Sequence, residues 1–177
     1  MFEEYFEKEE IKLLHVAKNQ ILQKPGGTST DAFYVKSGLL RSYLIDDDGK
    51  IHIFMFAPEG WIISDIESHT LSGSTLLFID AIEDSEVVQV SKVTPTTFTS
   101  VTNDKTQIIQ KLFRRIAVLQ SRVILLMSAS AMQRYEHFIS TYPQLVNRVP
   151  LKMIASYLGI TPEALSNIRS KIRHQES

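Results

Sequence analysis

The last thirty residues of the chain carry polar and basic side chains that suit the recognition of DNA. Glu can accept from cytosine N4, Asn can pair with adenine N6 and N7, and Ser is permissive at base edges. Basic side chains at the flanks of such a surface would meet phosphates. The candidate base-reading residues are Glu163, Ser166, Asn167 and Ser170. The candidate phosphate-binding residues are Arg169, Lys171 and Arg173, with Thr161 capping the helix near a phosphate.

Two short helices joined by a glycine turn are predicted to present these side chains. The first helix has an apolar face at helical spacing, made by Leu151, Ile154, Ala155 and Leu158. Gly159 can end it in the left-handed conformation. Thr161 and Pro162 then provide a hydroxyl cap and a proline for the first turn of the next helix. The second helix would bury Leu165, Ile168 and Ile172.

This arrangement predicts a helix-turn-helix, whose second helix enters the DNA major groove. Residues 148–177 contain five Lys and Arg residues against two acidic ones, whereas the whole chain has a formal net charge of −1. A basic end on an acidic body is expected of a DNA-binding tail. The alternative is an ordinary helical hairpin with a solvated polar face.

Composition excludes several other classes of protein. The chain has 177 residues, 44% of them hydrophobic, so a packed core is expected. It contains no cysteine, which excludes disulfides, thiolate zinc sites and Cys-ligated iron–sulfur clusters. No secretory signal and no membrane-spanning apolar run is apparent. Metal-binding His-x-His pairs, hydrolase elbows and phosphate loops are also missing. We expect a cytoplasmic protein that is not an enzyme, with no cofactor, metal or membrane partner.

The N-terminal half is predicted to begin with an amphipathic helix and to continue as a β-rich domain. The helix would run from Phe2 to Val16. From Asn19 to about Val93, short strands alternate with Gly-marked turns such as Ser37–Gly38 and Asp46–Lys50. This pattern predicts a β-sandwich or rolled barrel. The expected strands cover residues 32–35, 39–45, 51–56, 61–63, 76–79 and 85–90.

A long helix is predicted from about Asn103 to around Ser130. Apolar residues along it alternate spacings of three and four, which is the a/d seam of paired helices. The residues of this seam are Ile109, Leu112, Ile116, Leu119, Val123 and Leu126. A second apolar stripe suggests that one side meets the β-rich domain and the other a partner helix, although a helix buried within one subunit is the alternative. A further helix, about Met132 to Tyr142, would lead into the helix-turn-helix.

The order of these elements resembles the Crp/Fnr family of bacterial transcription regulators, and in particular its short members in Bacteroidetes-type bacteria. The motifs that carry the resemblance are Phe33-Tyr-Val-Lys-Ser-Gly38, Asp46-Asp-Asp-Gly49-Lys, Pro58-Glu-Gly60 and the segment from Leu151 to Arg169. The resemblance implies an α+β fold with three parts. These are a double-stranded β-roll of the cyclic-nucleotide-binding type (1–100), a dimerisation helix (101–131) and a helix-turn-helix domain without a full wing (132–177).

The same resemblance implies a homodimer that binds two-fold operator DNA and acts through RNA polymerase. The sequence departs from the cyclic-nucleotide-binding members at the effector pocket. Ser64-Asp65 stands in place of a Gly-Glu pair that holds the ribose, and Thr75-Leu76 replaces an Arg-Ser or Arg-Thr pair that holds the cyclic phosphate. Leu119 and Gln120 stand at about the positions where the long helix of those members contacts the nucleotide base. A phosphate without a cation is poorly compensated, so we expect no binding of cAMP, and the effector is unknown.

Two interpretations of the β-rich domain stay open. Trp61 and Phe78 either pack its core or line an apolar effector pocket. The chain could also be a small-ligand sensor or protein-interaction module that does not bind DNA. On the helix-turn-helix, Asn167 stands where many of the similar regulators carry Arg. Either Asn167 favours adenine over guanine as its contact, or this position of the site is read loosely.

Overall fold

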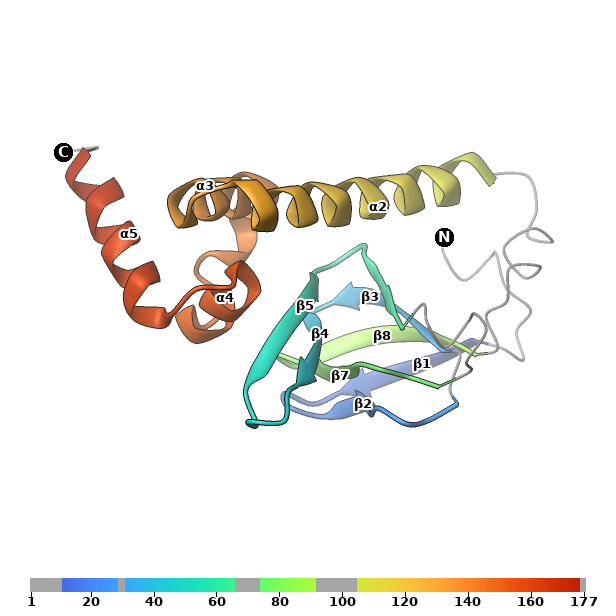
Figure 1. Cartoon of the computed structure of the whole chain (residues 1–177). Coiled ribbons are helices and arrows are strands. Elements are labelled where there is room, and N and C mark those ends of the chain that lie inside the picture. The colour runs from blue at the N-terminus through green and yellow to red at the C-terminus, as the bar shows by residue number, and fades with distance from the viewer. Residues whose placement is uncertain (1–10, 29–30, 66–73, 92–104, 176–177) are drawn as a thin grey trace. The chain divides into compact units, whose positions relative to one another are not determined.

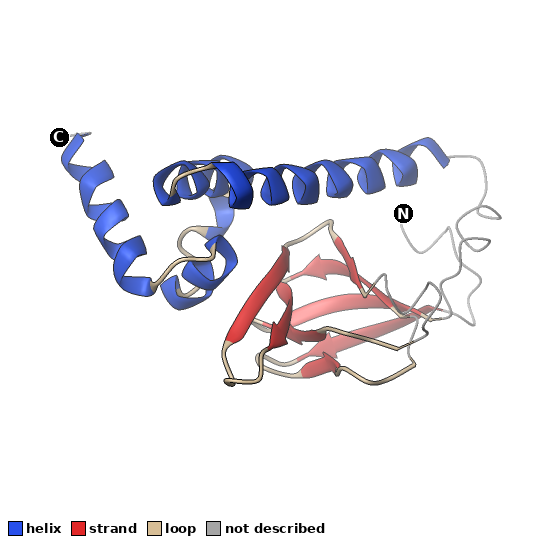
Figure 2. Ribbon diagram, in the orientation of Figure 1, coloured by secondary structure: helices blue, strands red, loops and turns tan. Residues whose placement is uncertain are grey.

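The computed structural model describes residues 11–28, 31–65, 74–91 and 105–175 (Figure 1). The chain divides into two compact units, Met1–Lys105 and Thr106–Ser177. Within the described residues, the strands belong to the first unit and the helices, drawn in blue in Figure 2, belong to the second, with the long helix starting at the boundary. Of the helices in the described ranges, none is both long enough and apolar enough to cross a membrane.

The first unit contains two antiparallel sheets, each of four strands within the described residues. One sheet has the order β1 (Ile11–Val16), β8 (Ser85–Val90), β3 (Ala32–Ser37) and β6 (Ile62–Ser64). The other has the order β2 (Ile21–Gln23), β7 (Phe78–Ala81), β4 (Leu40–Ile45) and β5 (Ile51–Ala57). Apart from the hairpin of β4 and β5, neighbours in each sheet are not consecutive in the sequence, as in the rolled architecture that the turn spacing predicts.

The first strand corrects the predicted N-terminal helix. Residues 11–16 form β1 and pair along their whole length with β8, from Ile11 opposite Val90 to Val16 opposite Ser85. The prediction for residues 2–10 lies outside the described residues. Leu14 and Val16 pack toward the core two positions apart, which is the period of a strand. The helical interpretation was wrong because this short apolar run fits both periods and its partner strand lies far along the chain. Strand β7 also begins two residues later than the predicted strand over 76–79.

Side chains from both sheets meet in one apolar core. Successive residues of a strand point to opposite faces, so alternate positions of each strand contribute. The buried members of this core are Val16, Phe33, Val35, Leu40, Met55, Ala57, Ile63, Ile79, Ala81 and Val87. Trp61 is half-buried and packs against it. Phe78 instead stacks on Tyr43 with ring centroids 5.1 Å apart. Both residues therefore pack within the roll.

The corner between β3 and β4 joins the two sheets. Gly38 lies there with φ of 91°, a left-handed conformation that suits glycine. A Cβ at this position would collide with Ser85 Oγ and lie 2.7 Å from the carbonyl oxygen of Asp84. The same Ser85 Oγ accepts a hydrogen bond from the Leu39 amide at 3.1 Å. The Ser37–Gly38 turn expected from the sequence is thus a packed junction as well as a reversal of the chain.

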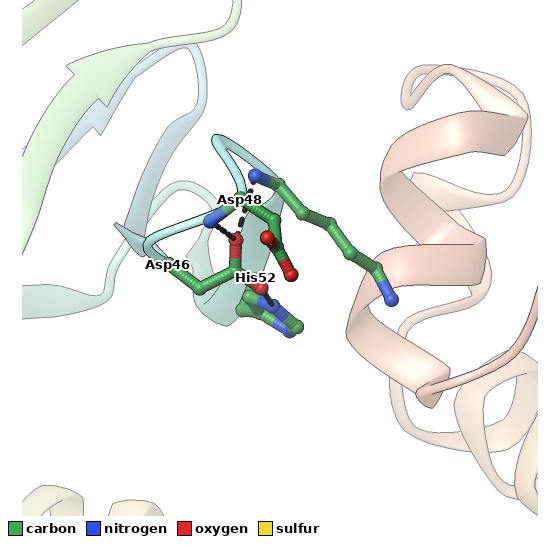
Figure 3. Close-up of polar contacts among 4 residues, drawn as sticks. Asp46, Asp48 and His52 are labelled. Atoms are coloured by element: carbon green, nitrogen blue, oxygen red, sulfur yellow. Dashed lines mark hydrogen bonds and ion pairs between the residues drawn. The ribbon is translucent and has the colours of Figure 1, made fainter.

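The hairpin between β4 and β5 is held by one carboxylate (Figure 3). Asp46 Oδ1 accepts from the backbone amides of Asp48 at 3.2 Å and Lys50 at 2.8 Å. Asp46 Oδ2 lies 2.6 Å from His52 Nε2, and the hydrogen bond with His52 lowers the pKa of Asp46. Gly49 has φ of 76°, which confirms the predicted hairpin loop with glycine at positive φ.

A buried ion pair links the two central strands of the second sheet. Arg41 on β4 donates from Nε and Nη2 to the two carboxylate oxygens of Asp80 on β7, at 2.6 and 2.8 Å. Only 8% of Arg41 and 4% of Asp80 is exposed. Burial alone would lower the pKa of Arg41, but the contact with Asp80 outweighs it and the pKa is raised. The guanidinium also lies over the Tyr43 ring, 4.5 Å from its centroid.

We predict that Asp80→Ala destabilises the roll by about 3–5 kcal/mol, because it leaves the Arg41 charge buried without its carboxylate. Urea unfolding followed by the fluorescence of the single tryptophan, Trp61, measures the effect. The double variant Arg41→Met/Asp80→Leu removes both charges and should recover most of the loss. A single variant as stable as the double variant would contradict the role assigned to the pair.

Candidate nucleic-acid interface

The predicted helix-turn-helix is present near the C-terminus. It consists of α4 (Leu151–Leu158), a turn and α5 (Pro162–Gln175), shown in orange to red in Figure 1. Gly159 ends α4 with φ of 66° and ψ of 37°, the left-handed cap that the sequence predicted. Thr161 Oγ1 accepts from the Ala164 amide at 3.1 Å, which confirms the expected cap of the second helix.

The inner faces of the two helices largely match the predicted stripes. The buried residues of the pair are Ile154, Ala155, Tyr157, Leu158, Leu165 and Ile168. Leu151 was assigned to the inner face but is 38% exposed, because it opens α4 and has no helical turn before it to pack beside. Ile172, near the other end of α5, is half-buried.

The candidate DNA-binding residues gather on α5 and at the position just before it. Exposed side chains are those of Thr161, Glu163, Ser166, Asn167, Lys171 and Arg173, and half-buried ones are those of Arg169 and Ser170. Glu163 lies in the first turn and Arg173 in the last, where each charge suits the helix dipole. The surface therefore offers neutral and acidic groups in the first half of α5 and cations in the second half.

A third helix and an aromatic cluster support this pair. Helix α3 (Ala131–Thr141) begins at a capping box in which Ser130 and Gln133 satisfy each other's backbone amides. It is followed by the short 3-10 helix η4 (Pro143–Leu145). The rings of Phe138, Tyr142 and Tyr157 have centroids 5.6 to 6.1 Å apart. Burial raises the pKa of both tyrosines, so they are neutral at physiological pH. These rings fix α4 on α3.

The long helix α2 (Lys105–Ser128) exposes much of its predicted seam. Ile116 is 57%, Val123 56% and Leu126 42% exposed, and Leu119 is half-buried. The side chains of Ile109 and Leu112 lie outside the described residues. Other large apolar side chains of α2 are also exposed, namely Phe113, Ile124 and Met127. An exposed apolar surface of this extent on one helix is a candidate surface for contact with another helix.

One residue of α2 that the sequence pattern does not single out contacts α4 directly. Arg122 donates from Nη2 to the carbonyl oxygen of Tyr157 at 3.0 Å. Its guanidinium also lies over the Tyr157 ring, 4.3 Å from the centroid. A cation at the edge of the apolar run from Val123 to Met127 is the one signal in the sequence that could have drawn attention to it.

In the roll, the positions expected to face an effector make internal hydrogen bonds instead. Asp65 is 3% exposed, and its Oδ2 accepts from the amides of Leu76 at 2.6 Å and Leu77 at 2.8 Å. Thr75 Oγ1 donates to the Lys24 carbonyl at 2.7 Å and accepts from the Gly27 amide at 3.0 Å.

The remaining effector-pocket candidates differ in burial and in the unit to which they belong. Ser64 ends β6 and is buried, whereas Leu76 is 59% exposed. Leu119 and Gln120 belong to the second unit, where Gln120 is exposed. Within the first unit, the structure therefore brings Asp65 together with the segment from Thr75 to Leu77.

Comparisons with known proteins support the fold. No family model matches the chain, and no curated protein matches it either. Solved structures match it over nearly its whole length. FixK2 of Bradyrhizobium japonicum is 21% identical with a TM-score of 0.72, over 94% of this chain and 86% of that one. The c-di-GMP-responsive global regulator CLP of Xanthomonas campestris is 14% identical with a TM-score of 0.71, over 95% and 89%.

A CRP/FNR-family transcriptional regulator of Thermus thermophilus is also similar, with 14% identity, a TM-score of 0.70 and coverage of 93% and 87%. The chain therefore has the α+β fold of the Crp/Fnr regulators, as the sequence motifs predicted.

We predict that Asp65→Ala lowers the free energy of unfolding of the roll by about 1–3 kcal/mol, because two amides lose their acceptor in a partly buried place. Asp65→Asn keeps one acceptor oxygen and should cost less. Urea unfolding read by Trp61 fluorescence compares both with Asp47→Ala, an exposed carboxylate of the hairpin. Equal stability of the Asp65→Ala and Asp47→Ala variants would contradict this role of Asp65.

Proposed function

We propose that the chain is a homodimeric, sequence-specific DNA-binding transcription regulator of the Crp/Fnr type. The observation that carries the proposal is the polar and basic outer face of α5. It is presented by a capped helix-turn-helix whose inner face is buried. Glu163, Ser166, Asn167 and Ser170 would face base edges, and Arg169, Lys171 and Arg173 would hold phosphates. Action in the cytoplasm through RNA polymerase follows from the resemblance to these regulators alone.

Dimerisation is supported by the exposed apolar residues of α2. Pairing two copies along the seam that contains Ile116 and Val123 would bury side chains that are more than half exposed in one chain. A two-fold axis along this helix would place two copies of α5 about 34 Å apart, which is one turn of DNA. In this arrangement residues 101–131 serve for dimerisation and residues 132–177 for DNA binding, while residues 1–100 form the sensing roll.

The roll is proposed not to bind cAMP. A cyclic phosphate needs cations or free amides to offset the loss of its hydration. The amides of Leu76 and Leu77, which could contact an anion, already bond to the Asp65 carboxylate. A phosphate there would meet a negative charge in place of a cation.

Isothermal titration with cAMP should therefore give no heat of binding, and saturable binding would refute this part of the proposal.

Selection of bound oligonucleotides from a random duplex pool by the purified protein tests DNA binding directly. The selected sequences should contain an inverted repeat. Failure to retain any duplex at low salt would refute the proposal. It would leave the alternative, a ligand sensor or protein-interaction module built on the roll.

We predict that Asn167→Ala relaxes base preference at one position of each half-site by roughly 1–3 kcal/mol, if its contact with adenine is bidentate. Quantitative binding to single-base variants of the selected site measures this change. As a matched comparison, Arg173→Ala should weaken binding to all sequences alike and reduce the salt dependence. An Asn167→Ala variant with unchanged selectivity would remove this residue from the reading face.

We predict that Val123→Asp shifts the protein from dimer to monomer, because pairing would bury an unmatched carboxylate in the seam at a cost of several kcal/mol. Sedimentation velocity over a range of concentrations measures the equilibrium. Gln110→Glu adds the same charge at an exposed position of α2 outside the seam and should leave the dimer intact. Equal behaviour of the two variants would place the dimer interface elsewhere.

A further inference from the structure

The contact between Arg122 and Tyr157 is the structural basis of a further inference, which rests on the proposed function. We infer that Arg122 is a positioning residue that holds the helix-turn-helix against the long helix. It would thereby set the distance between the two DNA half-sites that a dimer recognises. The residue touches no DNA in this arrangement. It acts through the backbone of α4.

The first support is the distribution of hydrogen bonds at the end of α4. The last four carbonyls of a helix have no partner within it. Two of them are satisfied by the turn itself. The Ala155 carbonyl accepts from the Ile160 amide at 3.0 Å. The Ser156 carbonyl accepts from the Gly159 amide at 3.1 Å. The Tyr157 carbonyl accepts from Arg122, so α2 satisfies a third carbonyl at this end of α4.

The second support is the electrostatic match at this joint. The C-terminus of a helix carries a partial negative charge, which a nearby cation stabilises. Arg122 brings its guanidinium to this end of α4 and stacks it on the Tyr157 ring at 4.3 Å. Burial lowers the pKa of Arg122, yet an arginine remains charged in proteins at neutral pH. A lysine could supply the charge but not the planar stacking.

The third support is the set of contacts around the turn that follows. An added Cβ at Gly159 would lie 3.4 Å from Leu126 of α2 and 3.5 Å from Arg134 of α3. Both side chains also line a cavity of about 20 Å³, together with Arg122 and Tyr157. That volume holds about one water molecule, so side chains of α2, α3 and α4 meet around a small space.

The consequence concerns the geometry of a dimer. If two copies pair along α2, each α5 is placed by its connection to that helix. A joint fixed at Arg122 gives the two reading helices one separation and one angle. Loss of the joint would let each helix-turn-helix tilt independently, while its own base-reading face stays unchanged.

A distance measurement within one chain tests the joint without DNA. The chain contains no cysteine, so spin labels can be placed at Gln110→Cys on α2 and His174→Cys on α5, both exposed. Labelled protein is diluted with unlabelled protein to suppress distances between subunits. Pulsed electron resonance should give one narrow distance, which Arg122→Met broadens and Arg122→Lys broadens less. Lys152→Met, an exposed cation of α4, should leave the distance narrow.

A binding measurement tests the consequence. The selected half-site is arranged as an inverted repeat with spacers that differ by one base pair. We expect the preference of the parent protein for one spacer to fall by about tenfold in Arg122→Met. Its preference among half-site sequences should be retained. Lys152→Met should keep the spacer preference.

The outcomes separate the two proposals. A parent protein that binds no duplex refutes the proposed function, whereas the distance measurement still tests the joint. An Arg122→Met variant with the narrow distance and the original spacer preference overturns the inference. If that variant does not fold, the distance distribution and the spacer preference of Arg122→Lys decide whether the inference holds. Loss of the fold in both variants would assign Arg122 to stability instead of positioning and would equally overturn it.

Discussion

The helical unit depends on the burial of one aromatic ring. Tyr157 is 7% exposed and meets Phe138 and Tyr142 on one side and the guanidinium of Arg122 on another. Tyr157 belongs to α4, Arg122 to α2 and Phe138 to α3, and Tyr142 directly follows α3. Side chains from three helices therefore meet at the Tyr157 ring. Helix α5 follows through the Gly159 turn and the buried Leu165. The exposed face of α5 is therefore positioned partly by contacts among residues outside that helix.

The helix-turn-helix could be predicted in detail because its determinants are close in the sequence. The left-handed Gly159 and the Thr161 cap each act within four residues, so their pattern is visible before folding. The strand at residues 11–16 could not be recognised in the same way. Its hydrogen bonds go to β8, about seventy residues away, and a short apolar run does not distinguish a strand from a helix. The contribution of Arg122 was missed for the same reason, since its partner is a backbone oxygen 35 residues away.

The roll shows how similar positions acquire a different use. Asp65 and Thr75 were chosen by their places in the sequence motifs, and the structure does bring their segments together. Their partners are backbone groups, which no spacing rule identifies. Asp65 and Thr75 each hold neighbouring chain segments together, and Arg41 and Asp80 do the same between strands. Asp65 and Thr75 therefore stabilise the backbone of the roll.

The corner at Gly38 limits how this architecture can vary. The residue combines a left-handed backbone with contacts to Asp84 and Ser85 that leave no room for even a methyl group. Relief would require moving the start of β8, and β8 lies between β1 and β3 in its sheet. Chains that share this roll can therefore change the loops that surround it freely, but not this position. Among diverged homologues, residue 38 should stay glycine even where the sequence of α5 has become unrecognisable.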